Sequence, residues 1–146
     1  MKKRILIFAL LLTGISYSYA DTTNGITKKT VASLNKDFAN AQNVQWQQKN
    51  DYSIATFSLN NDVMFAYYGN DGELKAVARN ILSDKLPIAQ MINLKKNYSN
   101  YWISNLFEVS IGNDTYYYVT VENADQKLIL KSAGTGWEEY SKEEKQ

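Results

Sequence analysis

Cysteine and histidine are absent from this chain of 146 residues, and proline occurs once. Their absence excludes disulfides, Ser-His-Asp and Cys-His catalytic groups, and zinc sites built on either residue. Glycine-rich phosphate loops are missing as well. Two routes to hydrolysis remain, which are a serine–lysine pair and a pair of carboxylates.

Neither remaining route is supported by the residue pattern. Ser132 follows Lys131, but adjacent residues of a strand point to opposite faces. The aspartates fall in predicted turns, where the side chain normally caps its own backbone. We therefore expect a protein that is not an enzyme and that has no metal site and no cofactor. The turn aspartates are Asp51, Asp62, Asp71, Asp114 and Asp125.

Charge is nearly balanced, with 16 Lys and Arg residues against 15 Asp and Glu residues. Proteins that bind nucleic acid carry a basic stripe, and no such stripe is visible in this sequence. We therefore expect no nucleic-acid partner.

Residues 1–20 have the pattern of a secretory signal peptide. A basic head of Lys2, Lys3 and Arg4 precedes an apolar run at residues 5–12, and small residues end the segment at Ala20. The run is too short for a comfortable membrane span, and nothing like it follows. We expect cleavage after Ala20, no membrane span in the mature chain, and a periplasmic or secreted location.

Two helices are predicted by apolar residues spaced three and four apart. The first covers residues 27–41, with Val31, Leu34 and Phe38 on one face. The second covers residues 84–98, with Ser83 or Asp84 expected to cap its start. Its expected face holds Ile88, Met91, Ile92, Lys95 and Tyr98.

Segments of period-two alternation, separated by Asn and Asp turns, predict the strands. The order is a helix, three or four strands, a second helix and three strands, without βαβ alternation, which predicts an α+β fold. We expect residues 137–146 to form a loose charged tail. The predicted strands are residues 43–47, 52–59, 63–68, 73–81, 102–111, 115–122 and 127–133.

The two halves repeat one pattern. At an offset of 64 residues, Tyr52 falls on Tyr116 and Gly72 falls on Gly136. This predicts one domain over residues 21–146, made of a first repeat at residues 27–81 and a second at residues 84–136. Duplicated units of a helix and strands usually build binding surfaces.

Alternation also separates the two faces of the sheet. One face is mostly aliphatic and is the expected partner of the helices. The other face should be polar in a sheet covered on one side, but it is rich in aromatic residues. Such a patch exceeds the area of about 300–600 Å² that a monomer usually exposes, so we predict a partner-binding face. A homodimer seam and plain stabilisation of the sheet are the alternatives. The predicted face comprises Tyr52, Ile54, Phe65, Tyr67, Tyr116 and Tyr118.

The order of aromatic and turn residues resembles the PepSY-like, β-lactamase-inhibitor-like (BLIP-like) periplasmic proteins of Bacteroidetes. The resemblance runs from about Val31 to Gly136. It rests on Phe38, Val44, Trp46, residues 52–59, residues 63–68, Gly72, Leu86, Pro87 and Tyr98.

The resemblance implies one curved antiparallel sheet with both helices on its convex side. It further implies that the aromatic concave face grips a protein and that an Asp-bearing hairpin enters its active site. The corresponding hairpin here is Asn60-Asn61-Asp62, with Asp62 as its tip. The resemblance therefore implies that this protein is an exported binding module that inhibits an enzyme or peptidase. The alternative is a periplasmic carrier or sensor of a small apolar or glycan ligand, with the same aromatic residues as stacking platforms.

Overall fold

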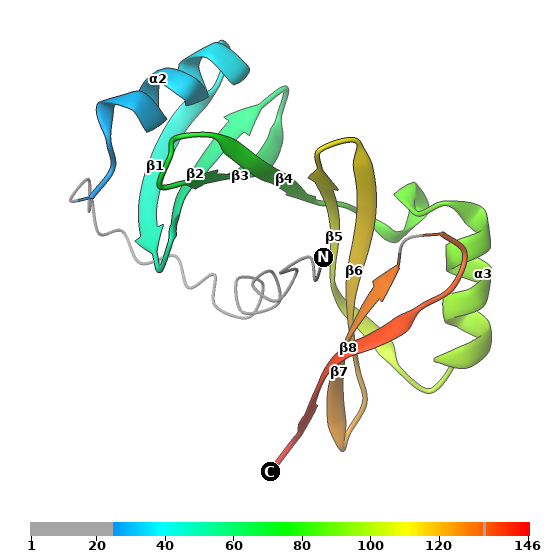
Figure 1. Ribbon diagram of the computed structural model, residues 1–146. Coiled ribbons are helices and arrows are strands. Elements are labelled where there is room, and N and C mark those ends of the chain that lie inside the picture. The colour runs from blue at the N-terminus through cyan, green and yellow to red at the C-terminus, as the bar shows by residue number, and fades with distance from the viewer. Residues whose placement is uncertain (1–24, 133) are drawn as a thin grey trace, which may run out of the picture.

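The structure is a computed structural model that describes residues 25–132 and 134–146. The predicted signal peptide, residues 1–20, lies outside the described residues. The described part is an α+β fold with two α-helices and one sheet of eight strands (Figure 1). The elements are α2 (Lys28–Asp37), β1 (Gln42–Lys49), β2 (Tyr52–Leu59), β3 (Asp62–Gly69), β4 (Leu74–Asn80), a 3₁₀-helix η1 (Ser83–Lys85), α3 (Ile88–Asn97), β5 (Trp102–Ile111), β6 (Asp114–Glu122), β7 (Gln126–Ser132) and β8 (Glu138–Glu144).

The sheet is a curved antiparallel meander in which every strand pairs with the next strand of the sequence. The helix-plus-strands repeat is therefore confirmed, with four strands in each half. The expectation of a loose tail is wrong for residues 138–144, because they form β8 and pair with β7. Alternation was hard to see there, since Tyr140 is the only apolar residue in a run of charges.

Helix α2 begins at the N-cap Thr27, whose Oγ1 accepts a hydrogen bond from the Thr30 N–H (3.1 Å). This bond satisfies one of the free N–H groups of the first turn. Leu34 is the main buried contact, and it packs with Phe57 and Tyr68 of the sheet. The first helix therefore covers the aliphatic face of the first repeat, as the sequence predicts.

Helix α3 covers the same sheet face in the second repeat, but its rotation differs from the prediction. Ile88 and Ile92 are 78% and 60% exposed, whereas Gln90 and Leu94 are buried. Pro87 occupies the N-cap position and no side chain caps the helix, so the expected capping by Ser83 or Asp84 is wrong. Gln90 is buried because its amide Nε2 donates to Ser132 Oγ (3.2 Å) and to the Gly134 carbonyl.

Strand register confirms the offset of the repeat. Thr56 of β2 pairs with Gln45 of β1, and Thr120 of β6 pairs with Asn105 of β5. Gln45 and Asn105 are equivalent, because each is the first paired residue after a bulge in its strand. The first strands therefore match at an offset of 60 residues and the second strands at 64, because the β5–β6 hairpin is longer. This hairpin turns at Gly112, where φ is 60°.

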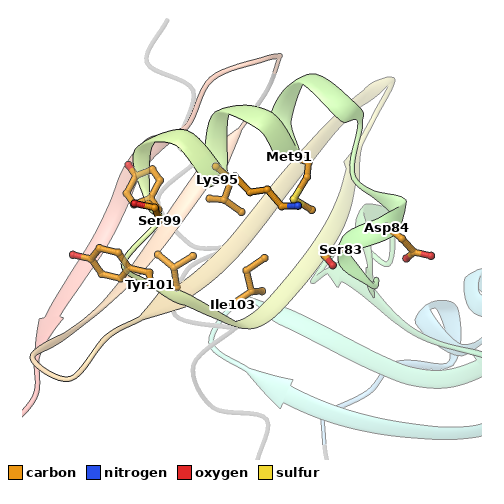
Figure 2. A pocket seen from close by; sticks show the side chains of 10 residues that line it. Ser83, Asp84, Met91, Lys95, Ser99, Tyr101 and Ile103 are labelled. Carbon is orange, nitrogen blue, oxygen red and sulfur yellow. The ribbon is translucent and has the colours of Figure 1, made fainter.

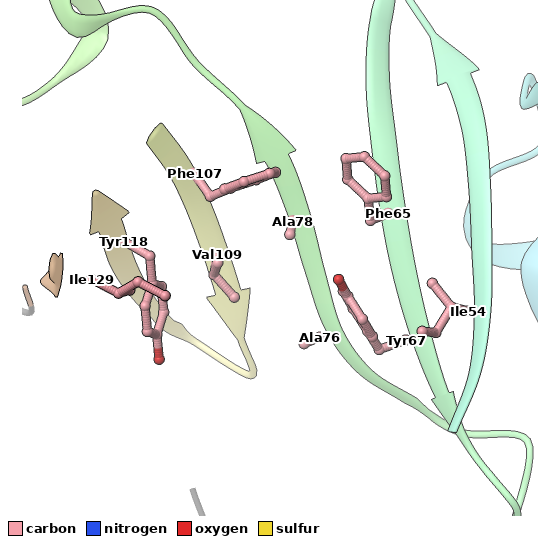
Figure 3. Packing of buried hydrophobic residues seen from close by; sticks show 9 residues of the cluster. All are labelled: Ile54, Phe65, Tyr67, Ala76, Ala78, Phe107, Val109, Tyr118 and Ile129. Carbon is pink, nitrogen blue, oxygen red and sulfur yellow. The ribbon is translucent and has the colours of Figure 1, made fainter. Parts of the chain in front are cut away.

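Three clusters of buried side chains hold the sheet. One lies under α2 within the first half, and one lies under α3 and also includes Ile81, which follows β4. The third lies on the sheet face without helices, which we call the helix-free face, and it crosses from β2 to β7 (Figure 3). Ala76 and Ala78 of β4 lie at its centre, which leaves room for larger side chains on both sides. The rings of Phe65 (β3) and Phe107 (β5) approach to 6.0 Å between centroids, edge to face.

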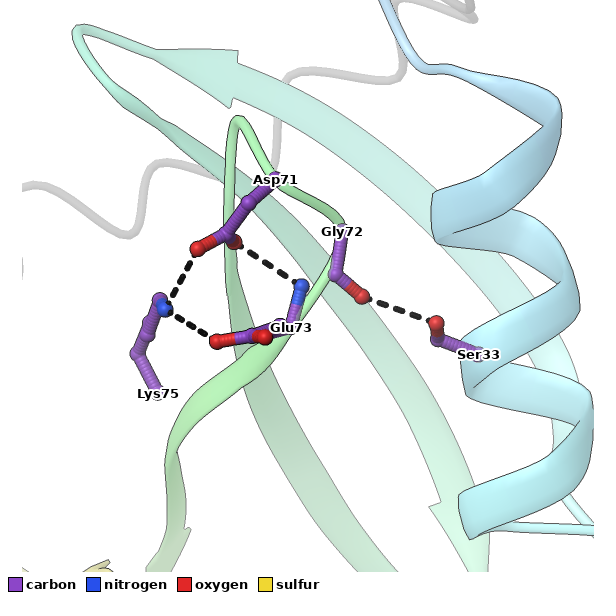
Figure 4. A network of polar contacts seen from close by, with 5 residues as sticks. All are labelled: Ser33, Asp71, Gly72, Glu73 and Lys75. Atoms are coloured by element: carbon purple, nitrogen blue, oxygen red, sulfur yellow. Dashed lines mark hydrogen bonds and ion pairs between the residues drawn. The ribbon is translucent and has the colours of Figure 1, made fainter.

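Gly72 joins the β3–β4 turn to α2. Its carbonyl accepts a hydrogen bond from Ser33 Oγ (2.8 Å), beside an ion-paired cluster of Asp71, Glu73 and Lys75 (Figure 4). The φ of Gly72 is 73°, and a Cβ atom there would lie 3.1 Å from Cγ of Lys29. Glycine is required at this position for its left-handed backbone and for the close approach of the helix.

Replacement of Gly72 by alanine should destabilise the fold more than the same change at Gly112. Both positions have positive φ, where an L side chain costs about 1–2 kcal/mol. Only Gly72 has a neighbour that a Cβ atom would meet, since nothing lies within 4 Å at Gly112. Urea unfolding of Gly72→Ala and Gly112→Ala measures the difference. Equal losses would show that α2 moves away without a penalty.

The Phe65–Phe107 contact should contribute a coupling energy across the junction of the two halves. A double-mutant cycle with Phe65→Leu and Phe107→Leu should give a coupling of about 0.5–1.5 kcal/mol in the free energy of unfolding, as for other aromatic pairs. The control cycle combines Phe107→Leu with Phe57→Leu, which lies on the helix side of the sheet. That cycle should be additive, and additivity in both cycles would contradict the contact.

Candidate functional site

The six predicted residues of the sheet lie together on the helix-free face. Ile54, Phe65, Tyr67 and Tyr118 are 7%, 6%, 2% and 1% exposed and belong to the buried cluster. The described structure therefore does not present them as the large exposed patch expected from the sequence. Tyr52 and Tyr116 are half-buried and pack against the border of the cluster.

The half-buried residues gather at one end of the strand ladder. Tyr52 begins β2, Ile111 ends β5, and Tyr116 lies near the start of β6. In an antiparallel meander these strand ends belong to the same end of the sheet. We call Tyr52, Ile111, Tyr116, Lys131 and Tyr140 the aromatic margin.

Lys131 and Tyr140 complete the aromatic margin. Lys131 Nζ lies 4.4 Å from the ring centroid of Tyr116 and 5.8 Å from that of Tyr118, which is the geometry of a cation–π contact. Tyr140 meets Tyr118 edge to face at 5.7 Å. The alternation of residues 127–131 places Lys131 on this face, but the sequence does not predict Tyr140 there, because residues 137–146 have the pattern of a charged tail.

A cavity of about 370 Å³ opens beside the aromatic margin. Tyr116, Lys131 and Glu138 line it together with Gly136 and Trp137. Trp137 is fixed by a hydrogen bond from its Nε1 to the carbonyl of Gln90 (3.0 Å). The cavity thus combines an aromatic wall, a cation and a carboxylate.

Asp62 lies apart from the aromatic residues. It has the same alternation as Met64 and Ala66, so its side chain is on the helix side of the sheet. Its carboxylate pairs with Arg79 (3.3 Å), which also pairs with Glu108 (2.8 Å). The turn before it consists of Asn60 and Asn61, with φ of 51° and 70°. The structure therefore does not bring the predicted hairpin aspartate together with the aromatic face.

A second cavity, of about 670 Å³, lies on the other face of the sheet under α3 (Figure 2). Its apolar walls include Met91, Leu94, Ile103 and Val121, and Lys95 lies at its rim. We call this second cavity the helix cavity. The sequence does not predict it, because the apolar residues of a helix and a strand do not reveal how closely the two elements pack.

The hydroxyl of Tyr118 is buried and has no hydrogen-bond partner in the structure (Figure 3). Burial raises the pKa of Tyr118 to about 12, and that of Tyr67 to about 12 as well. Neither phenol is therefore suited to act as a base near neutral pH. Among the described residues, no group of three or more His, Cys, Asp or Glu side chains is placed to hold a metal ion.

Solved structures that share this fold include the following three. A DUF2874 family protein from Bacteroides uniformis ATCC 8492 is 20% identical, with a TM-score of 0.73 over 81% of this chain and 88% of that chain. A protein from Bacteroides eggerthii DSM 20697 that is proposed to be periplasmic is 17% identical, with a TM-score of 0.73 over 81% and 88%. A BLIP-like protein from Bacteroides fragilis NCTC 9343 is 20% identical, with a TM-score of 0.70 over 81% and 85%.

These neighbours define the class as a BLIP-like, DUF2874 fold, and none of the three is described as a PepSY protein or as an enzyme. No family model and no curated protein matches the sequence. In the described part of the chain, neither helix has the length and apolar character to cross a membrane.

Alkaline pH should test the burial of Tyr118. Its pKa is about 12 in the folded protein and about 10 in an unfolded chain. Because the pKa is higher in the folded protein, the neutral phenol of Tyr118 favours the folded state over the unfolded one. This contribution to the free energy of unfolding is complete below about pH 10 and is lost as the pH rises to about 12. The free energy of unfolding in urea should fall over that interval, and it should fall less in Tyr118→Phe.

At neutral pH, Tyr118→Phe should be neutral or stabilising, because it removes a buried hydroxyl without a partner. Tyr68→Phe is the matched control, since it removes a hydroxyl that donates to Asp37 (3.3 Å). A loss of stability at pH 7 in Tyr118→Phe as large as in Tyr68→Phe would contradict the unpaired hydroxyl.

Proposed function

We propose that this protein is an exported, non-enzymatic binding module that holds a partner protein at the aromatic margin. The observation that carries the proposal is the gathering of half-buried Tyr52 and Tyr116 with Lys131 at one end of the helix-free face. Tyrosines of this kind have an apolar ring and a polar tip, and they are enriched at protein interfaces. The cation above Tyr116 adds a contact for a carboxylate or carbonyl of the partner.

The burial of the central residues supports the margin as the place of contact. Ile54, Phe65, Tyr67 and Tyr118 stabilise the sheet, and their side chains already have apolar neighbours. A partner therefore gains most from the half-buried tyrosines that frame them. Such anchors usually carry most of the affinity of an interface.

The BLIP-like neighbour supports a finer proposal, which is that the partner is an enzyme or peptidase that the protein inhibits. The position of Asp62 weighs against insertion of the Asn60–Asn61 hairpin together with the aromatic face, because its side chain is on the helix side. We therefore assign the contact to the aromatic margin alone. A periplasmic location is part of this proposal and agrees with the neighbour from Bacteroides eggerthii.

The cavity beside Tyr116 favours a second candidate, a carrier or sensor of a small glycan or apolar ligand. Its volume of about 370 Å³ is within the range of ligand sites. An aromatic wall with a cation and a carboxylate is suited to stacking a sugar ring and binding its hydroxyls. Native mass spectrometry of the purified protein distinguishes this candidate, since it should then show a bound small molecule.

Substitution of Tyr52 and Tyr116 by alanine should abolish capture of the partner from a periplasmic extract. The affinity should fall at least about tenfold, since each anchor of this kind contributes about 1–2 kcal/mol or more. The matched control is Tyr117→Ala, which is half-buried on the same strand but faces α3. Capture of the same partner by the double variant, at equal urea stability, would overturn the proposal.

A further inference from the structure

Strand β5 has an open edge at its N-terminal end. It pairs with β6 from end to end, apart from a bulge between Ile103 and Asn105, but β4 pairs only with residues 107–110. The last backbone hydrogen bond on the β4 side runs from the Ile81 N–H to the Leu106 carbonyl (3.0 Å), and Asn80 Nδ2 donates to Asn105 Oδ1 beside it (2.8 Å). On that side, residues 102–105 pair with no strand of the described chain. An open edge of this kind can accept the backbone of a further strand.

The helix cavity lies beside this open edge. Ile103 of the edge lines it opposite Met91 of α3 (Figure 2). Val121 of β6, which pairs with Ile103, lines it as well. Side chains of an added strand would alternate between the two faces of the sheet. Every second side chain would therefore point toward the helix side, where the cavity of about 670 Å³ has room for a large apolar group.

The first repeat provides an internal comparison. Its helix and first strand match those of the second repeat at an offset of 60 residues, so that buried Leu34 corresponds to buried Leu94. At four matching surface positions the second repeat is apolar and exposed, whereas the first repeat is polar or small; at Val44 and Ser104 the order is reversed. The core does not account for this difference, because these side chains are exposed. The pairs are Ile88 and Lys28, Ile92 and Ala32, Trp102 and Gln42, and Ile103 and Asn43.

Two charged groups lie at the helix cavity. Lys95 is on α3 and Asp84 is in η1, and neither forms an ion pair with a described residue. Lys95 extends along the wall of the cavity, whereas Asp84 lies at its far end (Figure 2). A carboxylate that enters with an apolar group would therefore find an unpaired cation.

We propose that the open edge of β5 and the helix cavity bind an extended peptide segment as an added strand. One large apolar side chain of the peptide occupies the cavity, and an acidic residue beside it pairs with Lys95. Backbone hydrogen bonds to residues 102–105 supply the alignment, and the cavity supplies the preference for an apolar residue. The helix cavity lies on the opposite face of the sheet from Tyr52 and Tyr116, and this proposal does not depend on the proposed function.

Selection from a random peptide library displayed on phage tests the proposal with the mature protein as the target. Enriched peptides should share a large apolar residue next to an acidic residue. The synthetic form of an enriched peptide should lose at least about tenfold in affinity for Ile103→Lys and for Lys95→Glu. Methylation of the peptide backbone nitrogens should cause a similar loss, because it removes the donors that pair with the edge.

Matched variants separate this site from other surfaces. Val44→Lys changes a residue of equal exposure on β1, at 37% against 38% for Ile103, and Lys96→Glu changes the lysine next to Lys95. Both should leave the affinity within about twofold. Circular dichroism and urea unfolding verify that each variant is folded.

Four outcomes would overturn the proposal. The first is enrichment of no peptide above an uncoated surface. The second is an affinity that survives both Ile103→Lys and backbone methylation. The third is that the enriched peptides lack an acidic residue and that dodecanoate competes with all of them for the helix cavity. Native mass spectrometry measures the binding of dodecanoate. Loss of binding in Tyr52→Ala/Tyr116→Ala would place the peptide at the aromatic margin instead.

Discussion

The two halves of the sheet are held together by the apolar cluster on the helix-free face. The cluster under α2 stays within its own half, and the cluster under α3 reaches the first half only at Ile81. The β4–β5 ladder is also short, since it extends only over Val77–Asn80 on β4. The helix-free cluster includes residues from Ile54 of β2 to Ile129 of β7, and Phe65 and Phe107 meet across β4. Without it, the repeats would meet only through Ile81, the short β4–β5 ladder and polar side-chain contacts between these strands, such as Arg79–Glu108 and Asn80–Asn105 (2.8 Å each).

This requirement limits where a partner can bind. Side chains that close the junction are buried and have apolar neighbours, so they are unavailable as anchors. Tyr52 and Tyr116 lie outside that constraint because they occupy the strand ends, where the cluster stops. The aromatic residues therefore differ along the strands: those at the centre are buried and stabilise the sheet, and those at the margin, where we propose the contact, remain half-buried.

The two repeats have the same order of elements but different connections between helix and sheet. In the first repeat, a small contact between Ser33 and Gly72 brings α2 close to the β3–β4 turn. In the second repeat, Gln90 is buried and bonded to Ser132, and Trp137 bonds to the helix backbone. The larger side chains of the second repeat accompany the helix cavity and the open edge of β5. The two repeats therefore differ in the surfaces beside their helices.

Much of the fold follows from the sequence. Period-three-and-four spacing identified both helices, alternation identified seven strands and assigned the aliphatic face to the helices, and Asn60-Asn61 marked a turn. Strand β8 is not predicted, because one apolar residue, Tyr140, does not make an alternating pattern. The rotation of α3 is not predicted, because Gln90 has the polarity of a surface residue, and its partners Ser132 and Gly134 are known only from the structure.

For the candidate site, the sequence by itself determined which residues share a face, because alternation along a strand fixes the direction of each side chain. Only the tertiary structure decided that Tyr67 and Tyr118 are buried while Tyr52 and Tyr116 remain half-exposed. It also decided that Asp62 pairs with Arg79 on the other face. These properties depend on the curvature of the sheet and on contacts between distant strands, which no local pattern of residues specifies.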